Sequence, residues 1–114
     1  MNPKVDTGEI IGVKRFPMSG NETVETLSRK TYKILPLLFE QIINYIVKND
    51  SLPESLETWK RIPYKRTELE ELATIDTGMS KKEIEKRIRA TFYKGKPAPF
   101  IELYGYRFEF DPER

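Results

Sequence analysis

Residues 67–110 carry four local signals in a fixed order: an acidic helix, a glycine-containing turn, a basic helix and an aromatic hairpin. The first helix is predicted to begin at Thr67, whose hydroxyl can cap it while Glu70 reaches back to the capping residue. Apolar residues follow at helical spacing until residues 75–78, which are of the turn type. This order limits the C-terminal half to a small arrangement of helices and hairpin.

The basic helix is predicted to begin at Ser80, with Glu83 three residues further on as in a capping box. Its apolar residues recur every four positions, at Ile84, Ile88 and Phe92. A rotation of about 100° per residue places four other side chains on the opposite side. They are Lys82, Lys86, Arg89 and Tyr93. One face of the helix is therefore expected to pack and the other to carry positive charge.

Two alternating segments, residues 100–103 and 106–110, flank Tyr104 and Gly105 and predict an antiparallel hairpin. Pairing Leu103 with Tyr106 also places Ile101 opposite Phe108. A two-residue turn and a longer loop around the same glycine both remain open, because Asn or Asp is preferred to Tyr at the first turn position. Upstream, residues 59–64 are expected to form a short edge strand, since a proline cannot donate to a central ladder.

This order of elements resembles the winged helix-turn-helix superfamily over residues 35–110. The resemblance implies an α+β fold that is mostly helical, with an N-terminal helical extension and a C-terminal β-hairpin wing. Residues 1–34 would form a strand and helix extension, and residues 35–114 the winged helix domain, as one cooperative unit. Residues 6–11, beginning at Asp6, are similar to the leader of some plasmid and phage replication initiators of winged-helix type, which would imply origin binding or replication accessory work.

The resemblance implies contact with double-stranded DNA, with residues 80–94 in the major groove. The residues expected at the DNA are Ser80, Lys82, Lys86, Arg89, Tyr93, Lys60, Arg61, Lys65, Arg66 and Arg107. Lys82 and Arg89 would lie near base edges or phosphates, and the cluster at 60–66 near phosphates that fix orientation. An ordinary solvated helix face and a lysine-guarded strand edge are the competing interpretations. Arg107 would enter the minor groove or pair with Glu102, and the pairing is favoured.

Charge is concentrated where this interface is expected. The 114-residue chain has a formal net charge of +2. Residues 59–96 hold eleven Lys or Arg against six Asp or Glu, which leaves the rest of the chain at −3. A local excess of this size suits a polyanionic partner without requiring one.

The chain contains no Cys and no His, which excludes disulfides, Cys/His zinc sites and catalysis by histidine triads or Cys-His pairs. Three carboxylates, Glu68, Glu70 and Glu71, lie in the first turn of a predicted helix, where the macrodipole favours acids without any metal. We therefore expect no enzyme activity, no metal and no cofactor. No early apolar run and no spanning helix are present, so the expected location is the cytoplasm, away from membranes.

The N-terminal half predicts a strand over residues 9–16 and an Asn21-capped helix running toward Ile34, with Pro36 kinking it or starting another helix. Residues 37–47 are apolar on more than one stripe, so that helix is expected to be buried nearly all round. Two alternatives follow from this pattern. Either a homodimer forms through residues 24–47, or the N-terminal helix covers the second face within one chain.

Two functions from different classes follow. The first is a small DNA-binding protein that regulates transcription or replication. The second is a winged-helix protein-interaction module, a replication accessory factor or an inhibitor of a host enzyme, with Tyr104, Tyr93 and Phe100 as anchors. Binding of DNA through lysines predicts a steep fall of affinity with salt, which an aromatic protein interface does not.

Overall fold

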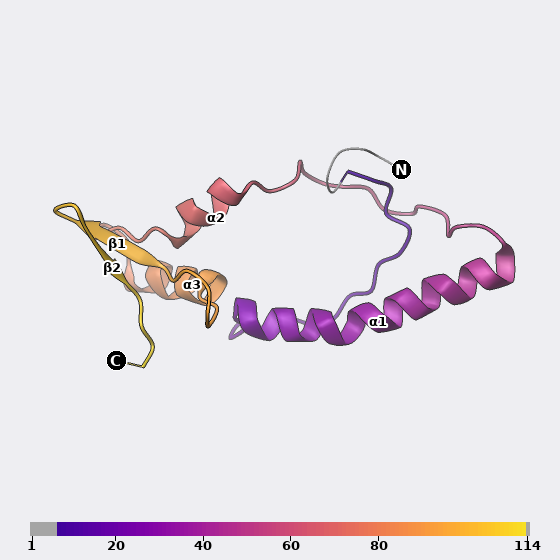
Figure 1. Cartoon of the computed structure of the whole chain (residues 1–114), viewed down its shortest axis with the longest axis horizontal. Coiled ribbons are helices and arrows are strands. Elements are labelled where there is room, and N and C mark those ends of the chain that lie inside the picture. The colour runs from indigo at the N-terminus through magenta and orange to yellow at the C-terminus, as the bar shows by residue number, and fades with distance from the viewer. Residues whose placement is uncertain (1–6, 114) are drawn as a thin grey trace. The chain divides into compact units, whose positions relative to one another are not determined.

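A computed structural model describes residues 7–113 and gives the chain an α+β fold (Figure 1). The described elements are α1 (Val24–Asn49), α2 (Arg66–Ala73), α3 (Lys81–Thr91), β1 (Phe100–Leu103) and β2 (Tyr106–Glu109). They fall into two compact units. The first comprises the residues up to Pro17 together with Arg29–Tyr64, and the second comprises Met18–Ser28 and the chain from Lys65 onward.

α1 is a single helix of 26 residues that contains Pro36. Its residues 24–28 belong to the second unit, and the remainder of the helix, from Arg29, belongs to the first. The alternative in which Pro36 starts a second helix is therefore wrong, and the proposed domain boundary after Ile34 falls inside α1. Proline removes one backbone hydrogen bond from a helix. Ile34 and Leu38, on either side of it, are both half-buried, and Leu38 lies against Gly12 of the N-terminal segment.

The apolar residues of α1 form two neighbouring stripes with different environments. The half-buried stripe consists of Ile34, Leu38, Ile42 and Ile46. The exposed stripe consists of Leu35, Phe39, Ile43 and Val47. The prediction that this helix is buried nearly all round is therefore wrong. No separate N-terminal helix exists within the described residues to cover the exposed stripe, because residues 24–34 belong to α1 itself.

Residues 9–16 do not form the predicted strand. Ile10 makes one isolated antiparallel bridge with Glu57, and no described segment pairs with the rest of this stretch. Gly12 instead lies directly against α1, where a Cβ atom would come within 2.9 Å of Ile42 Cδ1. Close packing against the helix thus replaces sheet pairing. Asp6 of the leader-like sequence lies outside the described residues.

In the second unit, the N-cap of α2 lies two residues before the predicted cap. Lys65 is the N-cap residue, and its N–H donates to Glu68 Oε2 at 2.6 Å, so the box between Thr67 and Glu70 is wrong. The predicted cap of α3 is confirmed, since Ser80 Oγ accepts from the Glu83 N–H at 3.1 Å. The N-terminus of α2 is thus capped by a carboxylate, and that of α3 by a hydroxyl.

The hairpin register is confirmed. Leu103 pairs with Tyr106, and the ladder continues to Phe100 opposite Glu109. The turn has two residues, Tyr104 with φ 53° and Gly105 with φ 80°. Both lie in the left-handed region that a two-residue hairpin turn of the I′ type requires.

The predicted third strand over residues 59–64 is absent. The segment after α2 takes the place beside β1, where Thr74 forms a parallel bridge with Phe100 and the Ile75 N–H donates to Phe100 O at 2.7 Å. The neighbour of β1 is therefore the segment that leaves α2, and not residues 59–64. The helix, turn, helix and hairpin follow in the predicted order, while the winged-helix assignment stays a prediction.

The core of the second unit is small. Ala98 and Pro99 are the buried residues among those described, and Pro99 O accepts from the Phe110 N–H at 2.8 Å. Phe92, just after α3, meets the Phe110 ring edge-on, with centroids 5.4 Å apart and planes at 83°. An edge-on aromatic pair contributes about 0.5–1.5 kcal/mol beyond its area. This pair fixes the end of α3 to the end of β2.

Candidate nucleic-acid interface

The outer face of α3 presents two of the predicted cations fully. Lys82 and Lys86 are exposed, and Arg89 is half-buried further along the helix. Within the described residues neither lysine forms an ion pair, whereas Lys81 beside them lies 3.7 Å from Glu85. Two unneutralised ammonium groups on one helix face are available to an anionic partner.

Ser80 and Tyr93, also predicted to contact DNA, do not extend this face. The Ser80 hydroxyl is engaged in capping α3, as described above. Tyr93 lies beyond the end of the helix at Thr91 and is half-buried. Its carbonyl accepts from the Lys96 N–H at 3.0 Å, in the turn that leads to β1. The cationic face is therefore shorter than predicted.

Arg87 has a role that the sequence did not reveal. Its side chain is 23% exposed, and its Nε lies 3.0 Å from Glu83 Oε1 one turn earlier. Its Nη1 donates to the carbonyl oxygens of Glu71, Leu72 and Thr74 at 3.1, 3.3 and 3.3 Å. These carbonyls belong to the C-terminal end of α2, where a cation complements the helix dipole. Arg87 thus fixes α3 to α2; the Glu83–Arg87 spacing was its only signal in the sequence.

Arg107 is held on the hairpin, but not by the predicted partner. Its Nε lies 3.2 Å from Glu109 Oε1, on the same strand, and its guanidinium lies 3.6 Å from the centre of the Phe100 ring. The favoured pairing with Glu102 is therefore wrong, although Glu102 is the residue opposite in the ladder. A planar guanidinium over an aromatic face gains a cation–π contact, which favours the neighbouring ring.

Lys65 and Arg66 are exposed at the beginning of α2. The first backbone N–H groups of a helix and its dipole favour negative charge at this end. The Glu68 carboxylate already meets this preference by accepting from the Lys65 N–H, so the positive charge offered to a partner here is that of the two side chains. In the second unit the structure therefore offers positive charge at the start of α2 and along α3.

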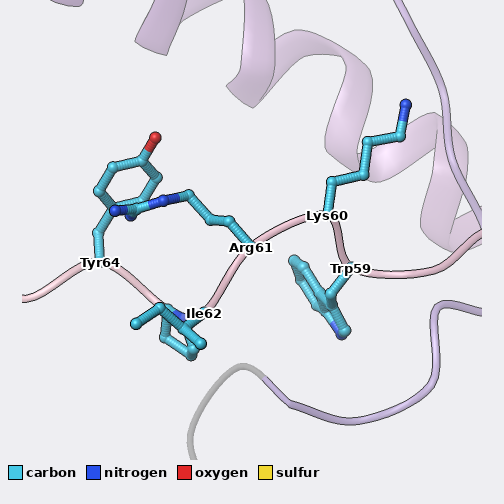
Figure 2. Close-up of a pocket in the computed structure, with 6 residues that line it drawn as sticks. Trp59, Lys60, Arg61, Ile62 and Tyr64 are labelled. Carbon is cyan, nitrogen blue, oxygen red and sulfur yellow. The ribbon is translucent and has the colours of Figure 1, made fainter.

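Lys60 and Arg61 belong to the first unit, in an extended segment that borders an open hollow of about 700 Å3. The hollow is lined by Trp59, Lys60, Arg61, Ile62, Pro63 and Tyr64. Figure 2 shows the Arg61 guanidinium lying across the Tyr64 ring, 3.5 Å from its centre, while the Lys60 amine points away from both aromatic rings. The segment that was predicted as a strand thus lines a hollow with aromatic and basic side chains.

Two contacts hold this segment to the N-terminal part of the first unit. Trp59 Nε1 donates to Gly8 O at 2.6 Å. Arg15 forms a two-pronged ion pair with Glu57, at 2.8 Å for Nη1–Oε1 and 2.7 Å for Nη2–Oε2. The hydrogen bonds from Arg15 lower the pKa of Glu57 below its ordinary value, and those to Glu57 raise the pKa of Arg15.

Of the aromatic residues proposed as protein anchors, Tyr104 alone is fully presented. It is 99% exposed at the hairpin tip, whereas Phe100 and Tyr93 are half-buried. Within residues 7–113, no helix is long and apolar enough to span a membrane, and no group of three or more acidic side chains is arranged to hold a metal.

The chain is similar in sequence to part of an enzyme. It is 30% identical over 105 residues to the methionyl-tRNA formyltransferase of Pseudoalteromonas translucida (strain TAC 125). The match covers 92% of this chain and 32% of that protein, so the chain spans about a third of the length of its relative. No protein-family model matches the chain.

Proposed function

We propose that the chain forms part of a formyl-transferring enzyme related to methionyl-tRNA formyltransferase, and that its cationic surfaces bind the phosphates of an RNA-linked acceptor. The observation that carries this proposal is the match over 92% of the chain, which includes residues of both compact units. The expectation of no enzyme activity was based on the absence of His and Cys from this chain. That absence says nothing about the remaining two thirds of an enzyme as long as the relative, which this chain does not cover.

The exposed lysines supply the chemistry that this acceptor requires. A tRNA presents a dense array of phosphates, and lysines that neutralise them release counterions, which favours binding. Lys82 and Lys86 project from α3 without an ion-pair partner among the described residues. Such contacts give affinity and orientation, whereas recognition of RNA sequence needs exposed bases.

A second candidate is the DNA-binding regulator predicted from the sequence. It is supported by the order of α2, turn, α3 and hairpin in the second unit, and by the exposure of the same two lysines. Both candidates require a polyanion at α3. They differ in the nucleic acid that is preferred.

Fluorescence anisotropy with labelled methionyl-tRNA and with a DNA duplex of equal phosphate number tests both candidates. The variant is Lys82→Glu with Lys86→Glu, and the matched control is Lys33→Glu with Lys48→Glu on exposed positions of α1. We expect tighter binding to the tRNA, an affinity at least about ten-fold lower in the α3 variant, and a salt slope reduced by about two. The control should bind like the unmodified chain.

A preference for the duplex would replace the formyltransferase proposal by the DNA-binding one. Failure to bind either nucleic acid at low salt, or equal loss in both double variants, would contradict the assignment of α3 as the interface.

We also propose that the exposed stripe of α1 mediates self-association. Phe39 is at the centre of this stripe and exposes most of its surface. Sedimentation equilibrium of the unmodified chain should show a dimer, and Phe39→Glu should weaken it, because a charge would be desolvated in the interface. Asn44→Glu, an exposed polar position on the same helix, is the control. A monomer at every concentration would contradict the proposal.

A further inference from the structure

The hollow formed by residues 59–64 combines aromatic, apolar walls with positively charged side chains. Its walls are largely apolar and aromatic, although Trp59 is 56% and Tyr64 76% exposed to solvent. Cationic side chains, Lys60 and Arg61, belong to the same short segment. Flat aromatic surfaces with adjacent positive charge fit a ligand that has a planar ring and an anionic group.

The two aromatic side chains are held in different ways. The indole N–H of Trp59 donates to Gly8 O at 2.6 Å, which fixes the ring while leaving much of it exposed. The Tyr64 ring is covered on one face by the Arg61 guanidinium at 3.5 Å. A guanidinium plane stacked on an aromatic ring can itself receive a base on its outer face. The hollow therefore presents stacking surfaces that are already formed, as Figure 2 shows.

We propose that this hollow binds a nucleoside monophosphate unit, with the base stacked on Trp59 or on the Arg61–Tyr64 pair, and that the flexible Lys60 side chain turns from its outward position to meet the phosphate. A base has two flat faces, and each stacked base typically contributes enough that loss of one aromatic partner weakens binding about five-fold to a hundred-fold. The unit can come from the unpaired end of an RNA or from a free nucleotide. The first source rests on the proposed function; the second does not.

Trp59 is the only tryptophan in the chain, so its fluorescence reports occupation of the hollow directly. Titration with adenosine 5′-monophosphate is expected to quench it, adenosine to quench it at higher concentration, and inorganic phosphate to leave it unchanged. Tyr64→Leu and Lys60→Met should each weaken the nucleotide about ten-fold. Tyr104→Leu, at the fully exposed hairpin tip, is the matched control and should have no effect.

No quenching by the nucleotide up to millimolar concentration would overturn the inference, as would equal affinities for the unmodified chain and for Tyr64→Leu with unchanged circular dichroism. A tRNA with its unpaired 3′ nucleotides and the same tRNA without them separate the two sources. Quenching by the nucleotide and by the intact tRNA, but not by the shortened tRNA, identifies the RNA end, and quenching by the free nucleotide alone identifies a small ligand. Salt-sensitive tRNA binding through α3, with no change at Trp59 on addition of either the tRNA or the nucleotide, would refute the hollow and leave the proposed function standing.

Discussion

The contact between Arg87 and the end of α2 predicts a large loss of stability from one substitution. Arg87→Met keeps the aliphatic stem and removes the guanidinium, which meets three carbonyl oxygens at 3.1–3.3 Å and Glu83 at 3.0 Å. All three carbonyls share one nitrogen, so we count them as one charge-assisted contact of about 1.5 kcal/mol. The ion pair one helical turn away adds about 0.5 kcal/mol. The expected loss in free energy of unfolding is about 2 kcal/mol.

Urea unfolding followed by circular dichroism measures this loss. With a slope of about 2 kcal/mol per molar urea, the midpoint should fall by about 1 M. Lys86→Met removes the same charge from an exposed position of α3 and should cost less than about 0.5 kcal/mol. Arg87→Lys should lie between the two, because an ammonium keeps the charge but lacks the planar fork. If Arg87→Met and Lys86→Met unfold at the same urea concentration, Arg87 does not fix α2 to α3.

Three further perturbations have defined outcomes. Ser80→Ala should destabilise α3 by about 1 kcal/mol in urea unfolding, because the Glu83 N–H loses its acceptor. Tyr104→Asn should raise the unfolding midpoint, since Asn tolerates the positive φ of 53° better than Tyr does; a lower midpoint would contradict the turn geometry. The pKa of Glu57 is lowered in the folded state, so the stabilisation by Arg15 is present above the ordinary pKa near 4.5 and is lost as the pH falls through the lowered value. In Arg15→Met, acid unfolding should begin at higher pH than in the unmodified chain.

The elements that the sequence predicted correctly are determined by neighbouring residues. Ser80 and Glu83 specify the start of α3 within one turn. The alternation around Gly105 specifies the hairpin register, because a slip by one residue would exchange its two faces. Lys82 and Lys86 were correctly placed on an exposed face, since helical periodicity alone determines that side.

The elements that the sequence did not predict depend on distant partners. Residues 59–64 have strand-like composition, but the place beside β1 is taken by Thr74. Arg87 could not be assigned to the end of α2, because its acceptors are backbone carbonyls that no side-chain pattern reveals. The strand register predicted that Arg107 pairs with Glu102, the residue opposite. Its guanidinium instead contacts the Phe100 ring and Glu109.

Three arginines and two lysines of this chain have different tasks, and the difference determines which substitutions are informative in a binding experiment. Arg15, Arg87 and Arg107 each hold a carboxylate, a helix end or an aromatic ring within their own unit. Replacing any of them changes folding as well as surface charge, so a loss of nucleic-acid binding would have two explanations. Lys82 and Lys86 are exposed and form no ion pair among the described residues, so their substitution changes the surface alone. Lys82 and Lys86 therefore test the interface, whereas Arg15, Arg87 and Arg107 test the structure of the units to which they belong.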